Sequence, residues 1–160
     1  MDAPRILLVS VSAGAGHGRA AEAMERTIRR QSTEITVRHI DLLDCINTTT
    51  RKLFFDSYET LATELPRLWG FFYNSINVPK RQQQFDAMTN IFKKFQAGRF
   101  LETVNEFAPD YILSTHFTPP DILHQHHDKL VSKPRLGVVI TDYAIHELWT
   151  RCHANDFFIS

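Results

Sequence analysis

The sequence predicts an α/β domain in which a parallel sheet carries helices on both faces. Three observations predict this class. Short apolar runs typical of buried strands recur along the chain, segments with helical periodicity separate them, and a glycine-spaced turn joins the first strand to the first helix. The length of 160 residues favours one domain with a substantial core.

The first strand, turn and helix form the clearest unit. A strand is predicted over residues 5–11, where a continuous apolar run begins at Ile6. Residues 12–18 form the turn, and a helix is predicted over residues 17–30, where small and apolar side chains share one stripe. Glycines in such a turn let the backbone approach a ligand closely, and the first helical turn offers unpaired N–H groups.

A second strand and a long helical region follow. Residues 35–40 alternate between apolar and polar side chains and predict a strand that ends at Asp41. Residues 50–107 show helical periodicity and many aromatic side chains, with interruptions at Pro66 and at residues 74–79.

The last part of the chain repeats the strand and helix pattern. Strands are predicted over residues 111–114, 136–140 and 156–160, and a helix is predicted from Pro119 to about Leu130. Because the chain ends in an apolar strand without a covering helix, we expect these 160 residues to be a fragment of a longer protein.

Polar groups follow four of the predicted strands. They are residues 14–17, Asp41, residues 115–116 and residues 141–142. Ligands of parallel sheets bind beyond the carboxyl ends of the strands, so we expect these groups to meet at one edge.

Composition limits the class of protein. The 18 basic and 18 acidic residues cancel, which does not favour nucleic acid as a partner. Cys45 and Cys152 make neither a disulfide framework nor a metal knuckle and suit a reducing compartment. No segment reaches the ~20 apolar residues that span a bilayer, so we expect a cytoplasmic protein, either free or peripheral on a membrane.

The glycine turn fits neither common nucleotide-binding motif. It lacks the Gly-Lys-Ser/Thr ending of a phosphate-binding loop, and the spacing of Gly14, Gly16 and Gly18 differs from that of a dinucleotide-binding motif. It is either a tight turn without a ligand or a place where the backbone approaches one. His17 either faces water or acts as an acid or base beside a polar ligand.

Other polar residues have two interpretations each. His116, Asp142 and His146 form either an acid–base or substrate-binding cluster or a set of capping and loop residues. A metal site is the weaker hypothesis, because no ligand spacing is present. Residues 124–127, which include three histidines, are interpreted as a solvated helix face, with a metal site as the alternative.

An aromatic segment lies in the long helical region. It contains Trp69, Phe71, Phe72 and Tyr73, and the basic residues 80–81 follow it. Aromatic rings near basic residues are typical of interfacial membrane segments, whereas a core helix is the alternative.

Four motifs, in order along the chain, give the sequence a family resemblance. They are residues 9–17 with residues 20–23, residues 40–44, residues 109–116, and residues 139–143 with His146 and Trp149. Together they resemble the N-terminal signature of the monogalactosyldiacylglycerol synthase and diacylglycerol glucosyltransferase family.

The resemblance implies the GT-B architecture, in which two Rossmann-like domains face a cleft. The N-terminal half of such an enzyme binds the lipid acceptor, and the C-terminal half binds the nucleotide-sugar. Residues 1–160 would then be the acceptor-binding domain, and the donor domain would be absent from this chain.

The resemblance also implies roles for residues. His17 matches the base that takes the proton of the diacylglycerol hydroxyl, which attacks a UDP-sugar with inversion and without a metal or other cofactor. Gly14, Gly16 and His116 would then line the acceptor side, and Asp142 and His146 would line it too or orient the base. The aromatic segment would contact a membrane surface that carries anionic lipid. A transferase for another lipid-linked acceptor, and a non-catalytic module that binds lipid or phosphate, are the alternatives.

Overall fold

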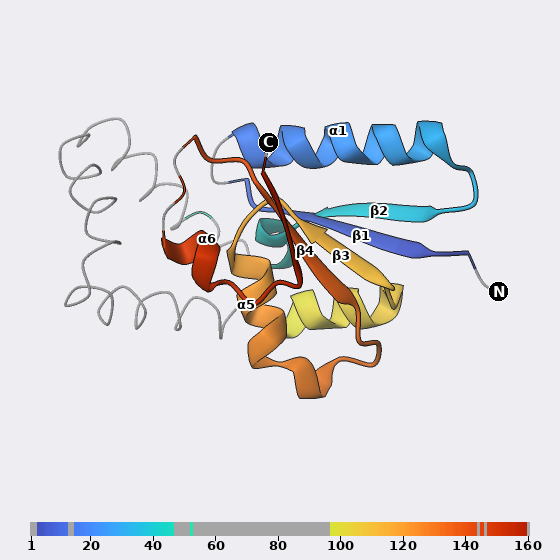
Figure 1. Ribbon diagram of the computed structural model, residues 1–160. Helices are drawn as coiled ribbons and strands as arrows, with labels where there is room; N and C mark the ends of the chain where they lie inside the picture. Colours follow the sequence, from blue (N-terminus) through green and yellow to red (C-terminus); the bar gives the residue numbers. More distant parts are fainter. Residues whose placement is uncertain are drawn as a thin grey trace, which may run out of the picture.

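The computed structural model describes residues 3–12, 15–46, 52, 97–143, 145 and 147–159. In this part of the chain, five strands form one sheet in the order β2-β1-β3-β4-β5 (Figure 1). Every paired strand is parallel to its neighbour. The elements are β1 (Arg5–Ser10), α1 (Ala15–Gln31), β2 (Thr36–Asp41), η1 (Leu42–Cys45), β3 (Tyr111–Ser114), α5 (Thr118–Gln125), η3 (His127–Lys129), β4 (Arg135–Ile140), α6 (Glu147–Arg151) and β5 (Asp156–Ile159).

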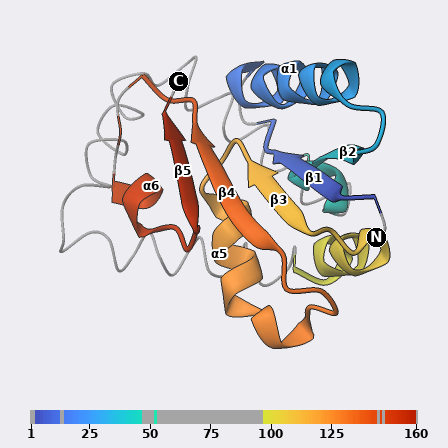
Figure 2. The ribbon, with the colours of Figure 1, turned by 45° about the vertical axis from the view of Figure 1, so that its right-hand side comes forward.

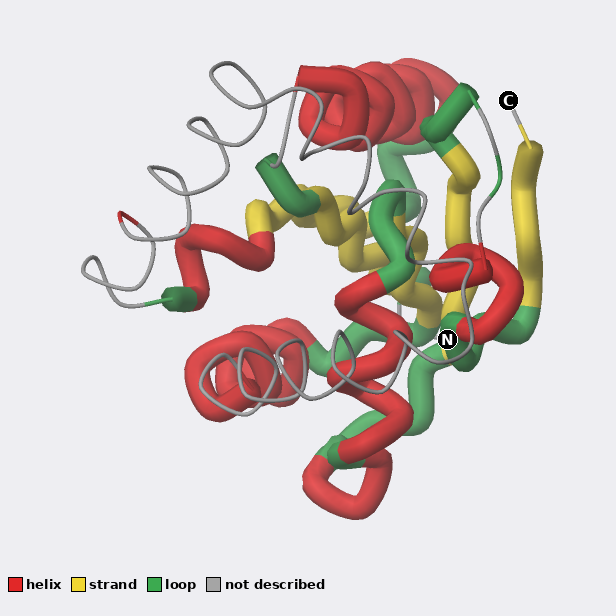
Figure 3. The backbone as a smooth tube through the Cα atoms, turned by 90° about the vertical axis from the view of Figure 1, so that its left-hand side faces the viewer, coloured by secondary structure: helices red, strands yellow, loops and turns green. Residues whose placement is uncertain are grey.

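Helices cover both faces of the sheet, as the sequence predicts. Helix α1 lies over one face, while the helical segment 97–107 and α5 lie over the other (Figure 1). Figure 3, turned by 90° from Figure 1, shows strands between these two layers. Successive residues of β1 point to opposite faces, so Leu7 and Leu8 belong to different layers, and both are fully buried.

The larger core lies under the helical segment 97–107 and α5. Leu7, Val9 and Ile112 of the sheet pack there with Phe100 and Ile122 of the helices. A smaller cluster joins Val138 and Ile140 of β4 to Trp149 and Cys152, with Phe117 packed against it. The smaller cluster lies beside the carboxyl ends of β3 and β4, the edge at which the predicted site residues are expected.

One predicted helix is shorter than expected. The helix predicted from Pro119 to about Leu130 ends at Gln125, and the short η3 follows it. The N–H of His126 bonds to the carbonyl of Leu123, three residues back, which tightens the last turn. The His127 ring also donates to the carbonyl of His124, at 3.1 Å, and so competes with the helical backbone.

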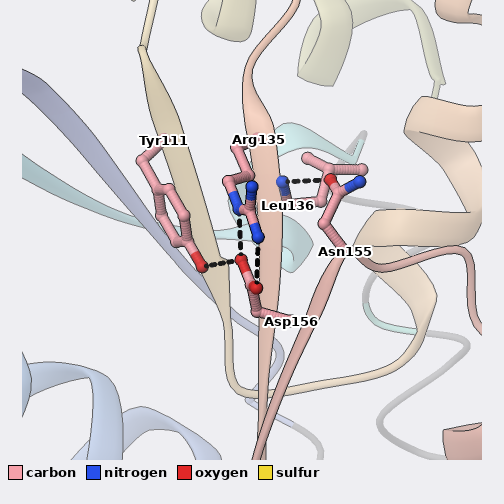
Figure 4. Close-up of polar contacts among 5 residues, drawn as sticks. All are labelled: Tyr111, Arg135, Leu136, Asn155 and Asp156. Carbon is pink, nitrogen blue, oxygen red and sulfur yellow. Dashed lines mark hydrogen bonds and ion pairs between the residues drawn. The ribbon is translucent and has the colours of Figure 1, made fainter.

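The amino ends of three strands are tied together by a polar network (Figure 4). Arg135 at the start of β4 holds the carboxylate of Asp156 with two bonds of 2.6 and 2.7 Å, and the hydroxyl of Tyr111 donates to it at 2.8 Å. These bonds, first from Arg135 and then from Tyr111, lower the pKa of Asp156 to about 2. Beside them, Leu136 and Asn155 exchange bonds of 2.8 and 2.7 Å, which fix the start of β5.

The fan of strands leaves the carboxyl ends on one side. Figure 2 shows the five strands next to one another, with β5 at one edge and β2 towards the other. The start of α1 and the whole of α6 lie on the side of the sheet away from the N-terminus (Figure 1). No helix among the described residues is long and apolar enough to cross a bilayer.

Candidate functional site

His17 lies where three strand ends meet. It belongs to the first turn of α1, directly after β1, and its ring reaches the ends of β3 and β4. Its Nδ1 atom is 2.8 Å from the carbonyl oxygen of Thr115 and 2.7 Å from the hydroxyl of Thr141. The hydroxyl of Thr115 in turn donates to the carbonyl of His17, at 3.0 Å. The parallel sheet therefore brings together residues that are about a hundred positions apart in sequence, as the strand-end argument predicts.

His116 lies beside His17. The two ring centroids are 5.0 Å apart, and the rings meet edge to face. The N–H of Thr118 donates to Nδ1 of His116, at 3.1 Å, which fixes this ring at the start of α5. The ring also lies 4.1 Å from that of Phe117. The predicted association of His17 with His116 is thus present in the structure.

Trp149 forms the wall behind both imidazoles. It is fully buried, and its ring centroid lies 6.4 Å from that of His17 and 6.1 Å from that of His116. Its Nε1–H donates to a carboxylate oxygen of Asp142, at 2.7 Å. Asp142 therefore contributes to the site indirectly, by accepting the hydrogen bond that holds the Trp149 ring in place.

Gly16 directly precedes His17 in the first turn of α1. It is exposed in the first turn of α1, and a Cβ atom placed there would meet no atom within 4 Å in the described part of the chain. No described protein group therefore requires a glycine here, and its role in binding an acceptor stays a prediction.

The sequence matches the monogalactosyldiacylglycerol synthase family over residues 17–160. The chain belongs to this family. Processive diacylglycerol beta-glucosyltransferases of Bacillus cereus (strain B4264) and Bacillus mycoides (strain KBAB4) are each 23% identical to it, over 168 and 174 residues. These matches cover 98% of this chain and 39% of each relative, so the chain spans well under half of their length. No solved structure matches the chain.

Several predicted site residues of this family member lie outside the described residues. They are Gly14, His146, Trp69, Phe71, Phe72 and Tyr73. The described part of the predicted site consists of Gly16, His17, His116 and Asp142.

Asp41, the polar group after β2, has a local structural role in this family member. Its carboxylate accepts from the N–H of Leu43 at 2.9 Å and caps η1, and it lies 3.3 Å from the N–H of Ser12. The strand-end position of Asp41 is therefore explained by backbone groups that it satisfies.

Of the histidines after Ile122, His124 packs against the loop before β5. The ring of His124 stacks on that of His153, with centroids 3.6 Å apart, and His153 lies 3.5 Å from a carboxylate oxygen of Asp121. The described residues hold no group of three or more His, Cys, Asp or Glu side chains that could bind a metal ion. The solvated helix face is confirmed for His124 and His127, which are exposed.

The sequence places Thr115 and Thr141 at this edge but does not assign them as partners of His17, and it does not single out Phe117. Both threonines come directly after strands and directly before residues that were singled out, His116 and Asp142. That position was the available signal. Hydroxyl side chains after strands are too common for the signal to distinguish a partner of His17 from an ordinary cap.

Proposed function

We propose that this chain is the acceptor-binding part of a hexosyltransferase that makes a glycolipid from diacylglycerol, with His17 as the general base. Family membership supports the class of reaction, and the relatives named above are processive diacylglycerol beta-glucosyltransferases. The observation that carries the proposal is the His17 ring, which is held through Nδ1 at the carboxyl edge of the sheet.

The reaction that we propose is a single displacement. His17 takes the proton of the acceptor hydroxyl while the hydroxyl oxygen forms a bond to the anomeric carbon of a UDP-hexose. The bond from that carbon to the diphosphate breaks, and UDP leaves with the electron pair, so the configuration at carbon is inverted. Both hydrogen bonds of the His17 ring to described residues involve Nδ1. In the proposed reaction, Nε2 receives the proton.

We assign acceptor binding to the same edge. Gly16 and Gly14 would let the lipid headgroup come close to the backbone, and His116, Asp142 and His146 would line the remaining side. The UDP-sugar would be bound mainly by a second, donor-binding domain of a GT-B enzyme, for which no residues of this chain are assigned.

The test is transfer by the complete protein that contains these residues. UDP-glucose and UDP-galactose are offered with diacylglycerol in vesicles, and the glycolipid product is measured by mass spectrometry. His17→Ala should lower turnover by about 10²- to 10⁴-fold, because general base catalysis contributes that much. His127→Ala, a change at an exposed histidine of η3, is the matched control and should keep wild-type turnover.

Each other outcome contradicts a particular part of the proposal. Transfer to a polyprenyl-linked acceptor but not to diacylglycerol would assign the protein to another lipid substrate. Vesicle binding without transfer of any hexose would indicate a non-catalytic module. A loss of less than about threefold in His17→Ala would remove His17 from the role of base.

We also propose that the protein works on the cytoplasmic membrane surface through its aromatic segment. The proposal rests on Trp69, Phe72 and the basic residues 80–81, because aromatic and basic side chains are typical of segments at a membrane surface. The double change Trp69→Ser and Phe72→Ser should reduce flotation with vesicles that contain anionic lipid. Val131→Ser, which alters an exposed apolar side chain elsewhere, should not. Equal flotation of the two variants would argue against this contact surface.

A further inference from the structure

The protonation of the His17 ring can be worked out from its neighbours. A carbonyl oxygen only accepts hydrogen bonds, and the carbonyl of Thr115 lies 2.8 Å from Nδ1. Nδ1 therefore carries the proton. A neutral imidazole has one N–H, so Nε2 has the lone pair and is the basic atom.

Thr141 provides a second acceptor for the same proton. Its hydroxyl oxygen is 2.7 Å from Nδ1, and its own proton can go to the carbonyl of Thr115, 3.4 Å away. Nδ1–H is then shared between two oxygens, and the threonine hydroxyl bridges them. The opposite arrangement, in which Thr141 donates to Nδ1, would set two lone pairs against each other at the carbonyl.

Hydrogen bonds and buried side chains tie the elements around the ring together. Thr115 is fully buried, and its hydroxyl donates to the backbone carbonyl of His17, so the start of α1 is bonded to the end of β3. Trp149 closes the space behind the ring. A flipped ring would replace Nδ1 by Cδ2 at the oxygens of Thr115 and Thr141 and would lose both hydrogen bonds.

We propose that Thr141 is a positioning residue that keeps His17 in the Nδ1–H form and so makes Nε2 the base; this rests on the proposed function of His17. When Nε2 takes a proton, Nδ1–H becomes a charge-assisted donor to both oxygens. The neutral hydroxyl oxygen of Thr141 would thus stabilise the protonated imidazole of His17. Among the described residues, no carboxylate is hydrogen-bonded to this ring.

The direct test is an NMR measurement on the protein labelled with ¹⁵N in histidine. The pattern of couplings between ring protons and ring nitrogens distinguishes the two tautomers of His17. Wild-type protein should show the Nδ1–H form. Thr141→Val removes the hydroxyl at nearly constant volume and should shift the tautomer ratio about fivefold towards Nε2–H, the effect of one hydrogen bond. Thr141→Ser keeps the hydroxyl and should restore the wild-type pattern.

Two results would overturn the proposal. One is an Nε2–H form of His17 in the wild-type protein, and the other is an unchanged tautomer ratio in Thr141→Val. Backbone amide spectra of each variant establish that it is folded, and Thr141→Ala, which also removes the hydroxyl, takes the place of the valine variant if that variant unfolds.

Turnover measurements separate this proposal from the function on which it rests. In the complete protein, Thr141→Val should lower kcat about fivefold with little change in KM for diacylglycerol, and Thr141→Ser should restore it. If His17→Ala leaves turnover intact while the tautomer shift occurs, the function of His17 fails and the positioning role stands. If His17→Ala removes turnover but Thr141→Val alters neither the tautomer nor kcat, only the positioning role fails.

Discussion

Gly137 in β4 lies against the ring of Tyr111 on the neighbouring strand. A Cβ atom at this position would collide with the Tyr111 hydroxyl and would lie 2.9 Å from a methyl carbon of Leu113. Tyr111 cannot move away easily, because its hydroxyl bonds to Asp156. We expect Gly137→Ala to lower the free energy of unfolding by ~1–3 kcal/mol, which is typical of overpacking. Urea unfolding followed by circular dichroism would measure it.

The matched control is Gly98→Ala in the helical segment 97–107. Gly98 is exposed, and a Cβ atom there would meet nothing within 4 Å in the described part of the chain. Alanine favours a helix over glycine by about 1 kcal/mol, so this variant should be as stable as the wild type or slightly more stable. Equal destabilisation of the two variants would show that the collision at β4 is not the cause.

At the residue scale, the sequence predicts the histidines of the site but not what holds them. His17 and His116 stand out because a histidine at the carboxyl edge of a parallel sheet can act as an acid or base beside a ligand. The partners of His17 at Nδ1 are a backbone carbonyl and a threonine hydroxyl, from Thr115 and Thr141. Every residue has a carbonyl, so nothing in the sequence could show which one accepts this bond.

We expect the polar network at the amino ends of β3, β4 and β5 to make the stability of the protein sensitive to acid. The pKa of Asp156 is lowered from 3.8 to about 2 in the folded protein, so the folded state binds fewer protons than the unfolded chain between these values. The stabilisation from Asp156 is therefore present above about pH 4 and is lost as the pH falls towards 2. Urea unfolding at several pH values should show wild type and Asp156→Asn converging over this range.

Asp128→Asn is the control for the loss of a carboxylate. Asp128 is exposed in η3, and no described hydrogen bond joins it to the network of Tyr111, Arg135 and Asp156. This variant should follow the wild-type curve at every pH. A constant difference between wild type and Asp156→Asn down to pH 2 would contradict the role of the Asp156 charge.

The same network is sensitive to alkali for the opposite reason. Burial, and then the bond to Asp156, raise the pKa of Tyr111 from 10 to about 12. The folded state thus keeps the phenol proton that the unfolded chain loses, so this stabilisation is full below pH 10 and is lost as the pH rises through about 12. Tyr111→Phe should therefore differ most from the wild type below pH 10, and absorbance of the tyrosinate would report the titration directly.

At the scale of elements, strands were easier to predict than helix ends. The strand predicted over residues 111–114 coincides with β3, and the strand predicted over residues 5–11 is one residue longer than β1. The apolar run of β1 predicts its strand well because the last four residues of the strand are buried. The end of α5 depends instead on a ring-to-backbone bond between His127 and His124, which a periodic pattern does not contain.

At the scale of the whole molecule, the class of fold follows from the order of elements, whereas the order of strands does not. A strand, helix and strand sequence predicts parallel pairing through crossovers. It does not say that β1 lies between β2 and β3, because the chain can cross to either side. The position of β1 is what brings His17 beside the ends of β3 and β4.

The order of strands in the sheet also predicts which backbone hydrogen bonds open first. β1 and β3 are each paired on both sides, and Leu7, Leu8 and Ile112 are buried, so their amides should exchange with deuterium most slowly. β5 is an edge of the described sheet, and its Phe157, Phe158 and Ile159 are exposed, so it should exchange faster.

β2 is the internal control, because it is also an edge in the described part of the chain. Helix α1 lies against it, and Arg29 of α1 donates to the carbonyl of Val37 at 2.8 Å. Pairing alone would give β2 and β5 the same exchange rates, whereas a covering helix should make β2 slower. Native-state exchange followed by mass spectrometry would decide. Equal rates in β2 and β5 would show that α1 does not protect the β2 edge. If β5 exchanged as slowly as β1, another part of the protein would have to cover β5, contrary to its exposure here.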